Sequence, residues 1–414
     1  MRPKRMIVVL AAALLFSFPG AAQNAKIKVL HNFGSSNDGN FPSGPPLLDN
    51  HGNLYGLTGG GPGQTGDGLV YELLPQARGG WKEKVLYSFT GGTGGSGPWG
   101  GLIFDSSGNL YGTLHGSPAD VGAVFALNRG TGGWTFNVLY TAGIDRGDGP
   151  GVVFDGSGNL YGDIGDGQGS FGAIGELSSE SGGWTYTQLY SICPQTGGCP
   201  DGYNEPVPPI WDASGNLWGT MLYGGIKQSP CLTSDGCGVI FEMTPNGDGT
   251  WTYDLIHQFA SSSSDGQFPD GGLVMDAAGN FYGNTQQGGA YGHGTIFKFS
   301  FSGGQWVETV LYDFPNCVQG CYPVGTLAID NAGNLYGTTI GGVHNQACGG
   351  FTCGEVFEMA RQGNGRWKFT LLHKFVGADG DSPIGVIHDG KGNLFGTTMS
   401  GGTYNAGTAF EITP

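Results

Sequence analysis

The chain has 414 residues, of which 84 are glycine and 12% are aromatic, and its formal net charge is −16 with a pI near 4.7. Abundant glycine with few charges is typical of low-complexity sequence, but this aromatic content supplies enough apolar surface for a folded core. The acidic balance repels phosphate backbones, so we expect no nucleic-acid partner.

The first 22 residues are typical of an export signal. Three basic residues precede an apolar run from Met6 to Phe18, and small residues at 20–22 precede Gln23. This run is too short to span a membrane, and no later segment approaches the required length. We therefore predict a signal peptide over residues 1–22 and one domain over residues 23–414. The product is expected to be secreted or periplasmic, monomeric and without a membrane span.

The motif D-x-x-G-N-[LF]-[YWF]-G occurs seven times, at intervals of 50 to 64 residues. Its copies begin at Asp49, Asp105, Asp155, Asp212, Asp276, Asp330 and Asp389. A unit repeated at this period must bury its apolar face against its neighbours. The Asp side chain can accept hydrogen bonds from turn N–H groups and the Gly can take positive φ, so each motif predicts a tight hairpin. Calcium binding would need more oxygen ligands than one Asp and one Asn per loop.

Each unit contains four strand-like runs. In the fifth unit these are residues 272–276, 280–285, 294–299 and 305–314. The first three are short and apolar, and the fourth alternates in polarity, which is typical of a strand at a more exposed edge.

The seventh unit has only three such runs, at 385–389, 393–398 and 407–412. The missing fourth run matches residues 26–33, which resemble the fourth runs at 84–89 and 370–375. An open solenoid would need capping units at both ends. The counts instead predict an all-β, seven-bladed β-propeller that is closed by the N-terminal strand pairing into the last blade.

All eight cysteines fall into close pairs: Cys193 with Cys199, Cys231 with Cys237, Cys317 with Cys321, and Cys348 with Cys353. Their even number and the export signal favour disulfides, and zinc is the weaker interpretation because no C-x-x-C spacing is present. The first two pairs belong to blade four and the last two to blade six, so three pairings are open within each blade. We expect each close pair to form its own disulfide. The cysteines lie in loops that join a fourth strand to the next first strand, or a second strand to a third, and we expect both kinds of loop on the face opposite the D-x-x-G-N hairpins.

The segments D-x-x-G-N-L-Y-G-T-T, G-T-V-F-E and L-Y-x-F resemble the GloVer-type tandem repeats of exported bacterial proteins. They are similar, more distantly, to NHL-type and gluconolactonase-like propeller repeats. The resemblance covers residues 26–414 and implies a propeller. Gluconolactonase-like propellers hold a metal in the central channel with a few acidic residues. GloVer-type proteins often carry a C-terminal anchor, whereas this chain stops within a blade, so we expect release into the periplasm or the medium.

Residues that recur at one position of every blade are expected to be scaffold. His31, His257 and His373 replace a recurrent tyrosine of the outer strands. A recurrent third-strand acid is expected to form a solvated face, and its copies are Glu72, Glu176, Glu242, Glu358 and Glu411.

Functional candidates are therefore residues in which one blade departs from the others. The weak catalytic candidates are Asp163, Glu205 and His115, and no complete catalytic set or metal site is evident. The residue and motif pattern predicts no cofactor.

Aromatic residues in the loops of the disulfide-bearing face are the binding candidates, because flat rings stack on sugars or anchor protein partners. They are Trp99, Tyr203, Phe268, Tyr291, Tyr322 and Tyr404. Phe-Pro or Tyr-Pro pairs recur in register at 41–42, 268–269 and 322–323, and packing between neighbouring blades explains these pairs equally well. We predict a secreted binding protein for extracellular carbohydrate or an envelope protein. The alternatives are a metal-dependent, lactonase-like hydrolase or lyase at the channel mouth, or a structural spacer.

Overall fold

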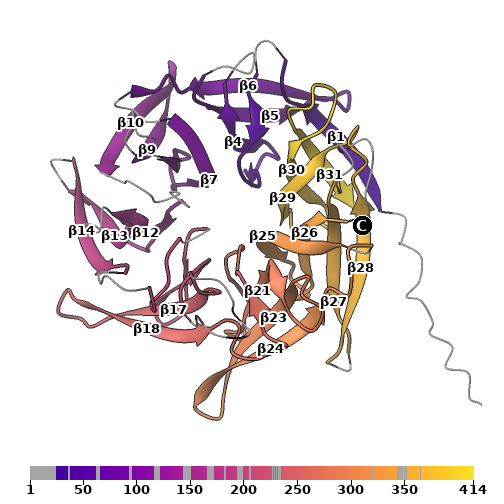
Figure 1. Cartoon of the computed structure of the whole chain (residues 1–414). Helices are drawn as coiled ribbons and strands as arrows, with labels where there is room; N and C mark the ends of the chain where they lie inside the picture. The colour runs from indigo at the N-terminus through magenta and orange to yellow at the C-terminus, as the bar shows by residue number, and fades with distance from the viewer. Residues whose placement is uncertain are drawn as a thin grey trace, which may run out of the picture.

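The computed structural model describes residues 25–35, 38–61, 66–92, 96–115, 122–142, 151–165, 172–180, 183–193, 199–204, 207–225, 227, 229, 231, 235–318, 320–342, 348, 352–363 and 365–414. Within these residues the chain forms antiparallel sheets arranged as a seven-bladed ring around a central axis (Figure 1). The predicted signal peptide lies outside the described residues. None of the described residues form a helix of the length and hydrophobicity needed to cross a bilayer.

Each blade runs from an inner first strand to an outer fourth strand. The strands of blades 1 to 3 are β2 (Asn40–Pro42), β3 (Leu47–Leu48), β4 (Leu54–Gly60), β5 (Leu69–Pro75) and β6 (Trp81–Ser88); β7 (Ser96–Phe104), β8 (Leu110–His115), β9 (Gly122–Gly130) and β10 (Gly133–Ala142); and β11 (Val153–Phe154), β12 (Leu160–Gly165), β13 (Ala173–Glu180) and β14 (Gly183–Ser191).

The strands of blades 4 to 6 are β15 (Ile210–Trp211), β16 (Leu217–Met221), β17 (Val239–Pro245) and β18 (Trp251–Gln258); β20 (Val274–Met275), β21 (Phe281–Thr285), β23 (Thr295–Ser302) and β24 (Gln305–Asp313); and β25 (Cys321–Ile329), β26 (Leu335–Gly341), β27 (Glu355–Arg361) and β28 (Trp367–Lys374). A further pair, β19 (Gly266–Gln267) with β22 (Gln287–Gly288), lies in the loops of blade 5.

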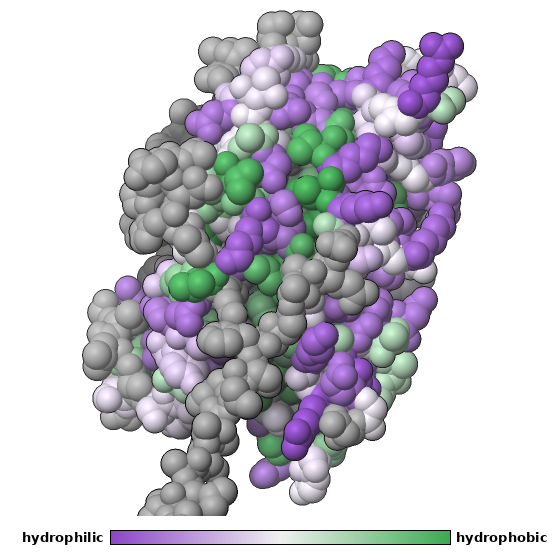
Figure 2. Space-filling model, turned by 90° about the vertical axis from the view of Figure 1, so that its right-hand side faces the viewer, coloured by the Kyte–Doolittle hydropathy of each residue, from purple (hydrophilic) through white to green (hydrophobic). Residues whose placement is uncertain are grey.

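The ring closes as the sequence predicts. Blade 7 contains β29 (Asp381–His388), β30 (Leu394–Ser400) and β31 (Thr408–Thr413), and its outer strand is β1 (Lys26–Asn32). The pairing of β1 with β31 runs from Lys26 opposite Thr413 to Asn32 opposite Thr408. Figure 2 views the side of the ring that carries this closure, where hydrophilic residues predominate and hydrophobic ones form scattered groups.

The D-x-x-G-N hairpins have the predicted chemistry. In blade 5, Asp276 Oδ1 accepts the backbone N–H groups of Ala278 and Asn280, each at 2.9 Å. Its other oxygen accepts the Tyr282 hydroxyl at 3.0 Å, and Gly279 has a φ of +76°. The aspartate therefore fixes both the turn and the strand that follows it.

The hydrophobic core lies between neighbouring sheets rather than within one blade. For example, Leu30 and Phe33 of the closing segment pack with Leu54 and Tyr71 of blade 1. Near the axis the sheets approach so closely that only glycine fits. A Cβ on Gly44 would lie 2.2 Å from the carbonyl oxygen of Gly100, and one on Gly271 would lie equally close to that of Gly325.

The expectation of a solvated glutamate face is wrong for the first blade. Glu72 is 5% exposed and accepts the hydroxyl hydrogen of Tyr55 at 2.7 Å. In blade 4, Glu242 accepts the side-chain amide of Asn216, also at 2.7 Å. Because the hairpin places a hydrogen-bond donor opposite this position, the glutamate ties the second strand to the third.

Candidate functional site

A cavity of about 530 Å³ lies where the first strands converge, at the channel end that faces the disulfide-bearing loops. Its walls come from blades 1, 2, 4, 5, 6 and 7. Six of its residues occupy one equivalent position, the residue after the proline near the start of the first strand: Ser43, Trp99, Val207, Asp270, Val324 and Ile384. Each of these blades therefore contributes one variable side chain to a shared hollow, which we call the channel-mouth pocket.

Trp99 supplies the aromatic wall of the channel-mouth pocket. It lies on β7 opposite Thr113 of β8, whose hydroxyl donates to the Trp99 carbonyl at 3.3 Å. Gly97 and Gly100 on either side have positive φ, which turns the chain tightly at this point. The tryptophan remains 41% exposed, so its ring is available to a ligand.

Asp270 supplies a carboxylate to the same pocket. The Asp270 side chain is partly exposed to the channel and is otherwise surrounded by protein. Burial raises the pKa of Asp270 to about 6 because the charged form loses water. His115, at the end of β8, and Asn204 add two further polar side chains to the lining.

The structure separates the three catalytic candidates. His115 lines the channel-mouth pocket. Asp163, on β12, is 4% exposed, is not part of that lining, and accepts the N–H of Ala173 at 3.0 Å. This contact fixes the start of β13 against the end of β12. Glu205 lies outside the described residues.

The six aromatic binding candidates fall into different surroundings. Trp99 lines the pocket. Tyr291 and Tyr404 are 59% and 49% exposed and lie in the loops between the second and third strands of blades 5 and 7. Tyr203 stacks on Tyr223 at 5.2 Å between ring centroids. Of the six, only Trp99 therefore combines exposure with a place in the pocket.

Phe268 and Tyr322 belong to the X-Pro pairs, and their geometry favours packing between blades. Their φ values are +59° and +56°, and each donates its backbone N–H to a carbonyl of the preceding blade. Phe268 is 9% exposed and packs on the Cys231–Cys237 disulfide. The following proline packs on a glycine of the preceding blade, as Pro269 does on Gly238.

The adjacent cysteine pairing is confirmed. The four disulfides join Cys193 to Cys199, Cys231 to Cys237, Cys317 to Cys321, and Cys348 to Cys353. They lie in loops of the face onto which the channel-mouth pocket opens. Four disulfides indicate an oxidising compartment outside the cytoplasm.

Sequence reasoning missed Asp270, although a signal for it was present. It occupies the position held by serine, tryptophan, valine or isoleucine in other blades, and so meets the criterion of departure from the repeat. It also missed two clusters of histidine, aspartate and glutamate between outer strands, in which His31 and His257 contact acidic residues. Alignment of the fourth strands places His31 opposite Glu83, and His257 opposite Glu308, only once the stagger of neighbouring sheets is known.

Comparisons with solved structures show the fold. The chain superposes on PorZ, an essential surface component of the type-IX secretion system of Porphyromonas gingivalis, with a TM-score of 0.51 and 11% identity, covering 92% of this chain and 48% of PorZ. It superposes on an ancestral GH74 enzyme with a TM-score of 0.51 and 12% identity, covering 91% of this chain and 51% of that enzyme.

A putative 6-phosphogluconolactonase from Bacteroides fragilis has a TM-score of 0.45 and 14% identity, covering 86% of both chains, which is a distant similarity to a lactonase-like propeller. No curated protein sequence matches the chain. The repeat named after Gloeobacter and Verrucomicrobia matches residues 12–232 and 209–414, which together span nearly the whole sequence. The chain therefore belongs to the Gloeobacter/Verrucomicrobia repeat family.

Proposed function

We propose that this propeller is an exported binding protein that recognises carbohydrate at the channel-mouth pocket. The observation that carries the proposal is the exposed Trp99 ring on the wall of a hollow that also holds the Asp270 carboxylate. An aromatic face stacks on the C–H face of a sugar ring, and a nearby carboxylate accepts its hydroxyl hydrogens. A volume of about 530 Å³ is suited to a ligand of one to a few sugar units.

The close packing of the first strands supports a binding role. A Cβ on Gly44 or Gly271 would lie 2.2 Å from a backbone oxygen of the next blade, so these strands are in close contact at the axis. A preformed site loses little conformational entropy when a ligand enters. Specificity would then reside in the six equivalent side chains, and an envelope protein would bind by inserting a loop into the same hollow.

Calorimetric titration with oligosaccharides selected on a glycan array tests the proposal. We expect Trp99→Ala to weaken binding at least tenfold, because stacking on the ring is lost. Phe301→Ala is the matched control, since Phe301 is 62% exposed on the opposite face, at the end of β23. Equal affinities of the two variants, or the absence of any glycan ligand, would refute carbohydrate recognition at this pocket.

The channel-centred hydrolase or lyase is the second candidate, and Asp270 favours it. A carboxyl group with its pKa raised to about 6 exchanges protons near neutral pH, as a general acid or base must. Turnover of lactones or polysaccharides that is abolished by Asp270→Asn would support this activity. Binding without turnover would leave Asp270 as a hydrogen-bond acceptor for the ligand.

A further inference from the structure

The outer strands of neighbouring blades meet at a repeated pair of positions. Near the end of each fourth strand, one position is occupied by Tyr or His. The side chain at this position faces the next fourth strand, at the residue four positions before that strand's own Tyr or His. At four of the seven junctions both residues are aromatic and stack, with ring centroids 4.2 to 4.6 Å apart: Tyr87 on Phe136, Tyr140 on Tyr186, Tyr190 on Tyr253, and Tyr312 on Phe369.

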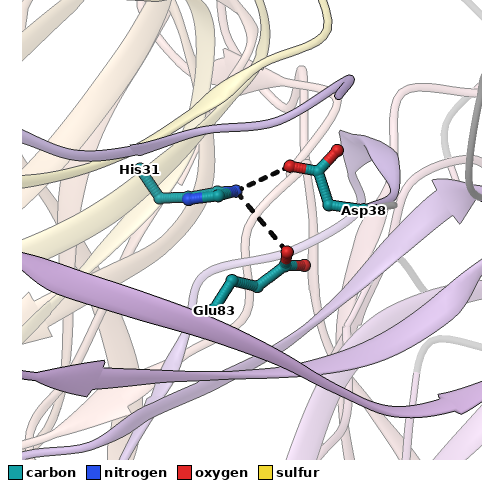
Figure 3. A group of neighbouring side chains, drawn as sticks. All are labelled: His31, Asp38 and Glu83. Carbon is teal, nitrogen blue, oxygen red and sulfur yellow. Dashed lines mark hydrogen bonds and ion pairs between the residues drawn. The ribbon is translucent and has the colours of Figure 1, made fainter. Parts of the chain in front are cut away.

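At two junctions the stack is replaced by ionisable groups. Between β1 and β6, His31 faces Glu83, and Asp38 enters from the loop that follows β1 (Figure 3). We call these three residues the closure cluster. His31 Nε2 lies 2.9 Å from an Asp38 carboxylate oxygen and 3.9 Å from one of Glu83. Both carboxylates point at the same imidazole nitrogen.

The second group lies between β18 and β24 and consists of His257, Asp265 and Glu308, which we call the blade 4/5 cluster. His257 Nε2 lies 3.5 Å from an Asp265 oxygen and 3.6 Å from a Glu308 oxygen. The same three residue types therefore recur at equivalent positions, contributed by two blades and the loop between them.

The aspartates of both clusters are buried and the glutamates nearly so, and three of these four acids have one unsatisfied oxygen. Asp38 and Asp265 are only 2% and 4% exposed. Within the described residues, one oxygen of Glu83, one of Glu308 and Oδ1 of Asp265 have no hydrogen-bond partner, and neither has His257 Nε2. Buried polar atoms without partners are rare because each costs free energy, so these atoms point to a ligand of opposite charge.

We propose that each cluster binds one divalent transition-metal ion of the zinc class, through one imidazole nitrogen and two carboxylate oxygens. Zinc holds such donors at about 2.0 to 2.2 Å, so in a tetrahedral site two donors lie about 3.4 Å apart. The separations of 3.5 and 3.6 Å in the blade 4/5 cluster fit this geometry. The three donor atoms of each cluster lie within 4.8 Å of one another, and water would complete the coordination.

The charge of the sites agrees with a divalent cation. Two carboxylates balance a charge of +2, which removes the repulsion between buried acids. In the closure cluster the ion would connect the closing strand β1 to blade 1.

The chain contains a natural comparison at a third junction. His373 of β28 contacts Asp379 at 2.8 Å, but the glutamate position of the next outer strand is occupied by Ile27 of β1. This junction therefore offers two of the three ligands. The proposal predicts two bound ions per chain, not three.

The experiment measures zinc, cobalt and nickel binding to the tag-free chain after chelator treatment. Equilibrium dialysis with metal analysis gives the number of ions, and the visible spectrum of Co²⁺ reports the coordination geometry. We expect about two ions per chain, about one after Glu308→Gln or Glu83→Gln, and none in the double variant. Asp379→Asn is the matched control and should leave two ions.

A gain-of-site variant keeps the test independent of lost folding. Ile27→Glu supplies the missing ligand beside His373 and Asp379, so it should raise the number of ions to about three. The melting temperature should rise with added ion in the parent chain but not in the Glu83→Gln/Glu308→Gln variant. Absence of binding at millimolar ion concentration, or two ions retained in the double variant, would overturn the proposal and leave contacts between histidine and acidic side chains alone.

Discussion

Phe33→Ala measures how much the closing segment contributes to the stability of the ring. Phe33 follows β1, is 0% exposed, and lies 4.9 Å from the ring of Tyr71 in blade 1 and 4.7 Å from the ring of His31. Its backbone N–H donates to Gly407 at 3.0 Å, a bond that alanine retains. The substitution therefore removes only packed side-chain volume, at a cost of about 3 to 5 kcal/mol. Total unfolding free energies are about 5 to 15 kcal/mol, so this loss is large.

Denaturant unfolding followed by tryptophan fluorescence measures this loss. Phe375→Ala at the equivalent position of blade 6, where the ring is 3% exposed, should cost a similar amount. Phe301→Ala, in a residue 62% exposed whose ring has an edge contact with Trp306, should lower the unfolding free energy by about 1 kcal/mol or less. If Phe33→Ala costs no more than Phe301→Ala, the N-terminal strand does not close the ring in solution.

Three further predictions concern the scaffold. Gly238→Ala should lower the unfolding free energy by roughly 2 kcal/mol or more. The backbone φ of Gly238 is +98°, and the added Cβ would lie 2.3 Å from Pro269. Thermal denaturation measures the loss. Replacing the buried Cys231–Cys237 disulfide with two alanines should cost about 2 kcal/mol by loop entropy, measured as a shift of the denaturant midpoint. Burial alone would raise the pKa values of five motif aspartates, but hydrogen bonds from the turn N–H groups and from the motif asparagine side chain together lower them below the ordinary 3.8, so their stabilisation is complete above that pH. The unfolding free energy should therefore fall as pH drops below about 4, measured by urea titration at successive pH values, through protonation of Asp49, Asp105, Asp276, Asp330 and Asp389.

The fold was predictable because its determinants are local and repeated. The hairpin motif carries its own turn chemistry, and the run at 26–33 matches the fourth strands in sequence. The largest departure is at the inner edge, where the predicted strand at 272–276 is reduced to β20 (Val274–Met275). Gly271 and Gly272 face the neighbouring blade at the axis instead of pairing within their own sheet, a constraint that appears only when the ring is closed.

The clusters of ionisable side chains could not be predicted from motif spacing. His31 and Glu83 lie in different blades, and the sequence between them contains a complete set of inner strands. His31 was correctly placed at a recurrent tyrosine position, yet the residue opposite it depends on the packing of one sheet on the next. The burial of Glu72 was missed for a related reason, because its partner Tyr55 lies on the adjacent strand.

The repeat separates the residues that build blades from those that define the pocket. In blades 1, 2, 5 and 6, a proline of the first strand or the loop before it contacts the preceding blade, a glycine two residues later allows close approach at the axis, and the residue between them faces the channel. Pro98, Trp99 and Gly100 illustrate this division in blade 2. Where the channel-facing side chain is not fully buried, its substitution should alter ligand preference at less cost in stability than a core substitution. An exchange such as Ile384→Asp, at a half-buried residue, adds a second carboxylate to the hollow. It should change the oligosaccharide profile while lowering the unfolding midpoint far less than Phe33→Ala does.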